Sequence, residues 1–455
     1  MSVHAPGTRW YNAVWRWHFY AGLFCLPFVL WLAATGSIYL WRPQIESWLD
    51  RPYDHLPISG RAADPEAIVA AALRAVPGAT FHTYQLPNAP GEAVRVIVAK
   101  TGVEQRVYVD PYRDRVLHVV GEEQRPMRVI FHLHGELLAG ALGSYLVELA
   151  ACWTITMLLT GLYLWWPRGR KGLAGVLYPR ISGSRRVFWR DLHAVAGIWA
   201  SVLALFLITT GLPWAKAWGS YLDDIRAATG TSDGPVDWTI GGKAPGEVAM
   251  PGDHAGHKGM AMPGGATMRH AAPKPGELNR VVAAAIPLDV ATPAMIAPPA
   301  AGATGWTISS DADDRPLRSQ AVIDGTTGRV VAFKPFAQRH WIDRAIGYGV
   351  AAHEGVLFGL ANQLLSTATA LLLMLLSVSG AVMWWLRRPT GLLGAPIPLQ
   401  RPRFGMVLFA SVSLLGFAMP LFGASLIAML IAERCILRRL AGPARWLGLK
   451  AARAG

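Results

Sequence analysis

The chain has 455 residues, of which 52% are hydrophobic and only 16% are charged, and its formal net charge is +14. Soluble domains carry about a quarter charged residues, so this composition excludes one large soluble enzyme and predicts a polytopic membrane protein. The basic residues gather in short segments between apolar runs, where they mark the cytoplasmic side of a membrane. We therefore expect no nucleic-acid partner.

Four apolar runs are long enough to cross a hydrocarbon core, which needs roughly 20 helical residues. They lie near 16–41, 144–166, 189–214 and 363–386. The first run lacks a convincing cleavage site, so we expect a retained helix and not a signal peptide. The segment 167–190 contains seven basic residues and no acidic one, which predicts a cytoplasmic loop and a cytoplasmic N-terminus.

A fifth apolar region, 404–432, has two interpretations. A single helix kinked at Pro420 would send the basic C-terminal tail outside, against the positive-inside rule. Two short helices broken at Pro420 would keep that tail in the cytoplasm, although each is short for a span. The sequence leaves both open.

Two pairs of helix motifs recur, each with a constant internal spacing. His18 with Thr35-Gly36 matches His193 with Thr210-Gly211. His134 with Thr160-Gly161 matches His353 with Ser379-Gly380 in the same way. Repeats of this kind often place a membrane protein's site at the interface between them.

The segments between the paired helices also repeat. Residues 107–117 match 321–331, and both predict a β-hairpin with an Asp-led turn. A helical stretch precedes each, near 66–76 and 277–286. We therefore expect a duplicated two-helix repeat with four core helices, a C-terminal apolar region and two small α+β modules outside the membrane.

The repeated histidines indicate a cofactor. His18 and His193 are expected near the inner face, and His134 and His353 near the outer face, so each leaflet receives one pair. Facing neutral imidazoles are suitable axial ligands for haem iron, which predicts two bis-histidine b-type haems. His132 points to a different helix face from His134, and the repeat favours His134.

The segment 250–270 is rich in histidine, methionine, glycine and proline. Thioethers and imidazoles together suit copper, so the segment is either a copper site or a polar loop without regular structure. The candidate ligands are His254, His257, Met260, Met262, Met268 and His270.

The pattern resembles the PepSY-associated transmembrane family, also described as iron-regulated membrane proteins. The resemblance rests on Trp17-His18 with Thr35-Gly36, on His134 with Thr160-Gly161-Leu162, on their second-half equivalents and on the two hairpins, and it covers roughly residues 10–390. It implies a bacterial inner-membrane protein with PepSY-like periplasmic modules, and some members are haem-containing reductases of ferric siderophores.

The expected parts follow in chain order. They are a membrane helix (1–42), a periplasmic module (43–131), a membrane helix (132–166), a basic cytoplasmic loop (167–188), a membrane helix (189–214), a periplasmic module with the insert (215–345), a membrane helix (346–386), a cytoplasmic loop (387–403), the C-terminal membrane region (404–436) and a basic tail (437–455).

We therefore expect a haem oxidoreductase that passes electrons outward to a periplasmic ferric chelate. The cytoplasmic loops are too short for a dinucleotide-binding unit, so a quinol or a separate cytoplasmic reductase must supply the electrons. The alternative is a copper-handling or transport accessory without redox catalysis. The hydrolytic motif HExxH is absent from the sequence, as are CxxC pairs.

Overall fold

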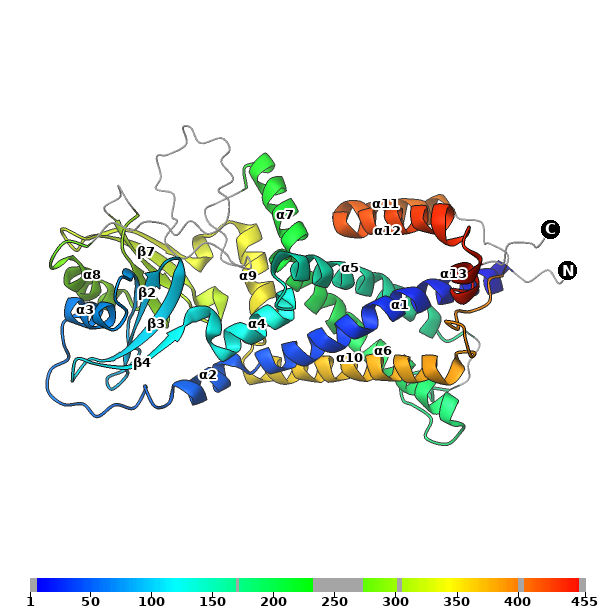
Figure 1. Ribbon diagram of the computed structural model, residues 1–455, viewed down its shortest axis with the longest axis horizontal. Coiled ribbons are helices and arrows are strands. Elements are labelled where there is room, and N and C mark those ends of the chain that lie inside the picture. The colour runs from blue at the N-terminus through cyan, green and yellow to red at the C-terminus, as the bar shows by residue number, and fades with distance from the viewer. Residues whose placement is uncertain (1–5, 169–171, 232–272, 301–304, 400–404, 450–455) are drawn as a thin grey trace. The chain divides into compact units, whose positions relative to one another are not determined.

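The computed structural model describes residues 6–168, 172–231, 273–300, 305–399 and 405–449. These residues form two compact units, whose elements are drawn in Figure 1. The membrane unit contains the described residues of 1–38, 132–225 and 364–455, and the sheet unit contains those of 39–131 and 226–363. The predicted insert at 250–270 lies outside the described residues.

The membrane unit is built on four long helices that coincide with the four predicted spans. The shortest has 26 residues, so each is at least about 39 Å long and exceeds a hydrocarbon core of about 30 Å. These helices are α1 (Pro6–Tyr39), α5 (Gly140–Trp165), α6 (Arg185–Gly211) and α10 (Leu360–Arg387). With the helix that begins at Pro420, they make five candidate spans among the described residues, as expected for a polytopic helical membrane protein.

The packed faces of these helices carry mostly small side chains. Ala196, Ala200 and Ala204 recur every fourth residue on the buried face of α6, and Ala21 and Cys25 do the same on α1. Small residues let helix backbones approach closely, which supplies dispersion contacts in lipid, where the hydrophobic effect does not draw helices together.

The fifth apolar region forms two helices, α11 (Met406–Ala418) and α12 (Pro420–Ala432). The chain folds back between them, and a Cβ on Gly423 would lie 3.1 Å from the Cα of Gly416 (Figure 1). Proline stops the first helix because it lacks an N–H, and it is well suited to begin the second. The structure thus has the second of the two arrangements that the sequence allowed.

The tail after this hairpin returns to the start of α1. It contains α13 (Ala441–Trp446), and the Arg16 guanidinium donates to the main-chain oxygens of Gly448 and Pro396. The start of α1, the residues after α10 and α13 therefore lie together, and we call this part of the membrane unit the basic end.

The sheet unit contains one antiparallel sheet that is shared by both predicted modules. The strand order is β4-β3-β2-β1-β5-β6-β7-β8, and Tyr84 and Gln85 pair with Ile296 and Met295 where the halves meet. The strands are β1 (Thr80–Gln85), β2 (Val94–Lys100), β3 (Val103–Asp110), β4 (Arg115–Gly121), β5 (Ala294–Ala297), β6 (Gly305–Ser310), β7 (Ser319–Asp324) and β8 (Val330–Pro335).

Helices α3 (Pro65–Ala75) and α8 (Glu277–Ala285) pack in the core on one face of this sheet. Alternate strand residues such as Val94, Val96 and Val98 point to that core, because side chains alternate between the faces of a strand. Helices α2 (Arg42–Asp50) and α9 (Trp341–His353) also belong to the described part of this unit.

The two hairpins at the ends of the sheet are built alike. A register shift directly precedes Val109 in β3 and Ile323 in β7, which are equivalent positions of the repeat. Each strand ends in an aspartate, Asp110 or Asp324, whose Oδ1 accepts the N–H two residues later at 2.9 Å. Such Asx turns favour a tight reversal, so both turns have the Asp-led form expected from the sequence.

Candidate functional site

The membrane unit brings two of the predicted ligands together. The ring centroids of His18 in α1 and His193 in α6 lie 6.4 Å apart, with the ring planes at 79°. An imidazole nitrogen binds a metal at about 2 Å and lies about 1.1 Å from its ring centre, so two imidazoles on one metal have centroids about 6 Å apart. The observed separation is close to this value, and it also lies in the range of a direct edge-to-face contact between the rings.

Each of these imidazoles is fixed through Nδ1 by a neighbouring helix. The Nδ1 of His18 lies 3.0 Å from a main-chain oxygen of α5 and 3.2 Å from Thr160 Oγ1. The Nδ1 of His193 lies 3.1 Å from a main-chain oxygen of α10 and 3.1 Å from Ser379 Oγ. A carbonyl oxygen only accepts, so Nδ1 carries the proton and Nε2 keeps the lone pair that binds a metal.

Glycines give both rings their space. A Cβ on Gly161 would lie 3.1 Å from Cε1 of His18, and one on Gly380 would lie 3.5 Å from Cε1 of His193. In the structure these glycines therefore lie directly against the imidazoles. The hydroxyl residue before each glycine fixes the same ring, and the sequence interpretation assigned that hydroxyl no role.

His134, in α4 (Pro126–Glu136), has a similar environment. Its Nδ1 lies 3.0 Å from Thr35 Oγ1, and a Cβ on Gly36 would lie 3.0 Å from its Cε1. His132 instead places its Nδ1 2.9 Å from Oε2 of Glu136, one turn further along the chain. The contacts with a hydroxyl group and a glycine that are seen at His18 therefore recur at His134.

The fourth histidine, His353, is the last residue of α9 and belongs to the sheet unit. Its pairing with His134 stays a prediction. Among the described residues, no group of three or more His, Cys, Asp or Glu side chains is arranged to hold a metal ion. A bis-histidine site has only two protein ligands, and the six candidate copper ligands lie outside the described residues.

The sequence interpretation missed a buried carboxylate in the membrane unit. Glu148 in α5 is 1% exposed and accepts hydrogen bonds at 2.8 and 3.2 Å from two N–H groups in the first turn of α7 (Lys216–Thr229). Ser144 accepts a third at 3.2 Å. These amides have no partner within their own helix, and the helix dipole favours negative charge there. A lone glutamate in an apolar run was the signal that could have revealed it.

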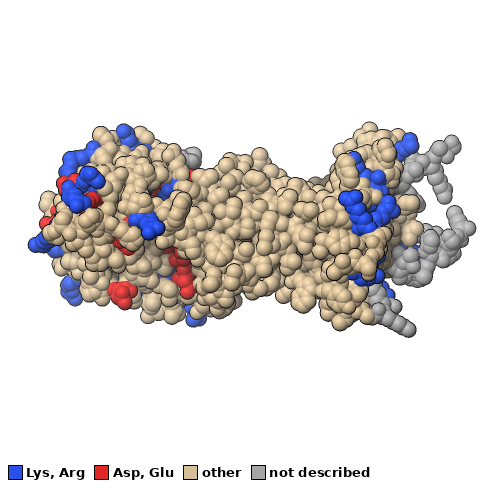
Figure 2. Space-filling view, turned by 90° about the horizontal axis from the view of Figure 1, so that it is seen from below, with Lys and Arg blue, Asp and Glu red and all other residues tan. Residues whose placement is uncertain are grey.

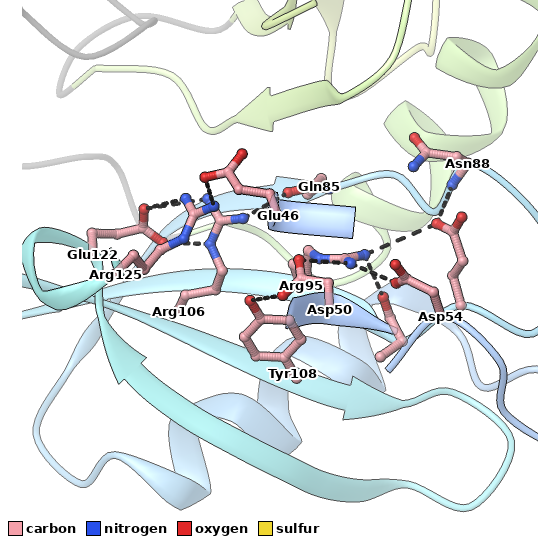
Figure 3. Close-up of polar contacts among 12 residues, drawn as sticks. Glu46, Asp50, Asp54, Gln85, Asn88, Arg95, Arg106, Tyr108, Glu122 and Arg125 are labelled. Atoms are coloured by element: carbon pink, nitrogen blue, oxygen red, sulfur yellow. Dashed lines mark hydrogen bonds and ion pairs between the residues drawn. The ribbon is translucent and has the colours of Figure 1, made fainter. Parts of the chain in front are cut away.

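A polar network in the sheet unit fastens α2 and the end of β4 to the sheet (Figure 3). Arg95 pairs with Asp50 at 3.1 Å, and Arg106 pairs with Glu122, which also contacts Arg125 at 3.3 Å. Burial opposes ionisation of Glu122, but the two arginines outweigh it and keep its pKa below the ordinary 4.5. Because each of these arginines is paired with at least one carboxylate, we interpret the network as a structural clamp.

Comparison with known proteins places the chain in a family. No curated protein matches it. A family model described as the PepSY-associated TM region matches residues 15–387, which include all four repeated histidines and both hairpins but not α11, α12 or α13. The chain therefore belongs to the PepSY-associated TM region family.

Proposed function

We propose that this protein is a b-type haem oxidoreductase of the bacterial inner membrane that passes electrons outward to a periplasmic ferric chelate. The observation that carries the proposal is the His18–His193 pair, whose rings are 6.4 Å apart and are both held through Nδ1. Paired imidazoles are a common axial ligand set for haem, which supplies one-electron redox chemistry when bound.

The residues of the chain have distinct roles in this proposal. His18 and His193 would hold the haem iron, and Thr160 and Ser379 would orient their rings from α5 and α10. Partners that hold the second nitrogen of a ligating histidine fix its tautomer and raise its basicity.

The sequence repeat predicts a second haem at His134. Thr35 and Gly36 contact His134 as Thr160 and Gly161 contact His18, so the same local motif recurs at a second place in the membrane unit. Two sites at opposite faces would give a path across a bilayer of about 30 Å. The donor is a quinol or a separate cytoplasmic reductase.

A ferric chelate is the proposed acceptor because reduction weakens its complex. Fe(II) is less charged and softer than Fe(III), so hard oxygen ligands such as those of siderophores hold it less firmly. Reduction on the periplasmic side would therefore release iron for uptake.

The test is haem content. Purified protein, reconstituted with haem, should show a b-type band in the dithionite-reduced spectrum, and His193→Ala should lose about half of the haem because one of two sites is removed. His55→Ala is the matched control, since His55 is exposed, and it should keep the full content. Absence of the band from wild-type protein, or unchanged content in a monodisperse His193→Ala sample, would overturn the proposal.

A further inference from the structure

The basic end of the membrane unit contains a cavity of about 320 Å³ beside the C-terminus of α10. It is lined by Trp385, Arg388 and Trp446 and by residues 389–392. We call it the Arg388 cavity. None of these residues belongs to the histidine site described above.

Arg388 is fixed in this cavity by aromatic stacking. Its guanidinium carbon lies 4.1 Å from the ring centre of Trp385 and 5.2 Å from that of Trp384. Stacking of this kind restrains the plane of the guanidinium and leaves the N–H groups on its edge available. Within the described part of the chain, Arg388 has no carboxylate partner.

The walls of the cavity are tied to one another. The indole N–H of Trp384 donates to the oxygen of Leu393 at 2.8 Å, and the N–H of Leu393 donates to the oxygen of Trp446 at 3.0 Å. These bonds join α10, the following loop and α13. The main-chain N–H groups of Thr390 and Gly391 make no hydrogen bond to any other described residue, which leaves two further donors beside the cavity.

The surroundings of the cavity attract anions. Figure 2 shows Lys and Arg gathered at this end of the membrane unit, next to a band without charged residues. The exposed fractions of Trp385 and Trp446 are 63% and 50%, and tryptophan at the edge of an apolar band is typical of the membrane interface. Basic pockets at this level between membrane helices bind anionic lipid headgroups.

We propose that the Arg388 cavity binds the phosphate group of an anionic phospholipid. The Arg388 guanidinium matches two phosphate oxygens, and the free N–H groups of Thr390 and Gly391 supply additional donors. Trp385 and Trp446 contact the glycerol region of the same lipid. Inorganic phosphate offers the same oxygens, but it lacks the chains that the neighbouring apolar band would contact. This inference does not depend on the proposed haem chemistry.

The experiment is a calorimetric titration of delipidated full-length protein in neutral detergent with dioctanoyl phosphatidylglycerol. Arg388→Gln should weaken binding about tenfold or more, because it removes a charge-assisted bidentate contact. Arg185→Gln is the matched control, since Arg185 is an exposed arginine at the start of α6 and the substitution changes the net charge equally. It should change the affinity by less than about twofold.

Two further ligands separate the possible sources of binding. Dioctanoylglycerol has the same chains without a phosphate and should not compete. Inorganic phosphate should compete only at far higher concentration, and competition at the lipid's own affinity would overturn the assignment to a lipid. Equal affinity of wild-type and Arg388→Gln protein would overturn the site itself. Arg388→Lys keeps the positive charge but loses the paired N–H groups of the guanidinium, so it should bind the lipid with intermediate affinity. Such residual binding would show that the cavity is still folded in this variant.

Discussion

Substituting two equivalent glycines gives a sharp test of how the histidine rings are held. In Gly161→Ala the new methyl group would lie 3.1 Å from His18 Cε1, closer than about nine in ten real Cβ contacts. In Gly380→Ala it would lie 3.5 Å from His193 Cε1, an ordinary van der Waals distance. The first substitution must therefore displace an imidazole by about 0.3 Å, whereas the second need not.

The difference between the two variants isolates this contact. Replacing glycine by alanine inside a helix gains up to about 1 kcal/mol from propensity, and this gain is shared by both positions. Crowding in a packed interior costs about 1 to 3 kcal/mol, and only Gly161→Ala should incur it. We therefore expect Gly161→Ala to be less stable than Gly380→Ala by about 1 kcal/mol or more.

The assay is thermal unfolding of both detergent-solubilised variants, followed by the loss of the monodisperse peak in size-exclusion chromatography. A difference of about 1 kcal/mol corresponds to about 2 to 4 °C for a unit of this size. Gly36→Ala, whose methyl would lie 3.0 Å from the ring of His134, should resemble Gly161→Ala. If Gly380→Ala melted at or below the temperature of Gly161→Ala, the reasoning from ring contacts would be refuted.

Three other substitutions test separate parts of the structure. Arg226→Met removes a side chain that is 2% exposed and paired with Asp343, so it leaves a carboxylate without its partner. The free energy of unfolding of the sheet unit, measured with denaturant, should fall by about 3 to 5 kcal/mol. An unchanged midpoint of the denaturant curve would contradict this. Burial opposes the charge of Glu122, but nearby arginines keep its pKa in the folded protein below 4.5. Its contribution to the free energy of unfolding is therefore complete above that pH and is lost as the pH falls through the folded pKa. Glu122→Gln should flatten the dependence of the unfolding free energy on pH in that window, and an equally steep dependence would refute this. Thr160→Val removes one hydrogen-bond partner of His18 and leaves the main-chain carbonyl partner in place. The melting temperature of this variant should therefore fall by the equivalent of about 1 kcal/mol. A larger loss than in His18→Ala would contradict the role of Thr160 as a partner of His18 alone.

The long spans and the two hairpins could be predicted because their signals are local. Apolar runs of about 20 residues or more indicate spans without knowledge of their neighbours. The alternation in 107–117 and 321–331, together with Asp110 and Asp324, was enough to place both turns. The structure has β3 and β4 in the first of these segments, and β7 and β8 begin at Ser319 and Val330 around the second.

The shared sheet could not be predicted in the same way. Tyr84 and Ile296 are far apart in the chain, and an edge strand carries no local mark of the strand that pairs with it. We expected two small α+β modules in 43–131 and 215–345, because each range contains one hairpin preceded by a helical stretch. The two halves join because β1 and β5 each have unpaired backbone N–H and C=O groups at one edge, and these edges exist only after each half has folded.

The ends of the membrane helices show a second limit. Pro420 permits either a kink or a full break, because membrane helices tolerate proline where neighbours satisfy the freed backbone groups. The contact between Gly416 and Gly423 settles the matter only after the chain has folded back. Likewise Thr160 and Ser379 were visible in the sequence, but their hydroxyls gain a role only when helix rotation turns them to a histidine.

The seam between β1 and β5 makes the two halves of the sheet unit mutually dependent. Cutting the gene into two separately expressed polypeptides would leave each half with an open strand, whose N–H and C=O groups along Tyr84 or Ile296 would be left without partners. Such a strand invites pairing with any other chain that offers one. Because both halves belong to one polypeptide, the pairing of β1 with β5 does not depend on the protein concentration.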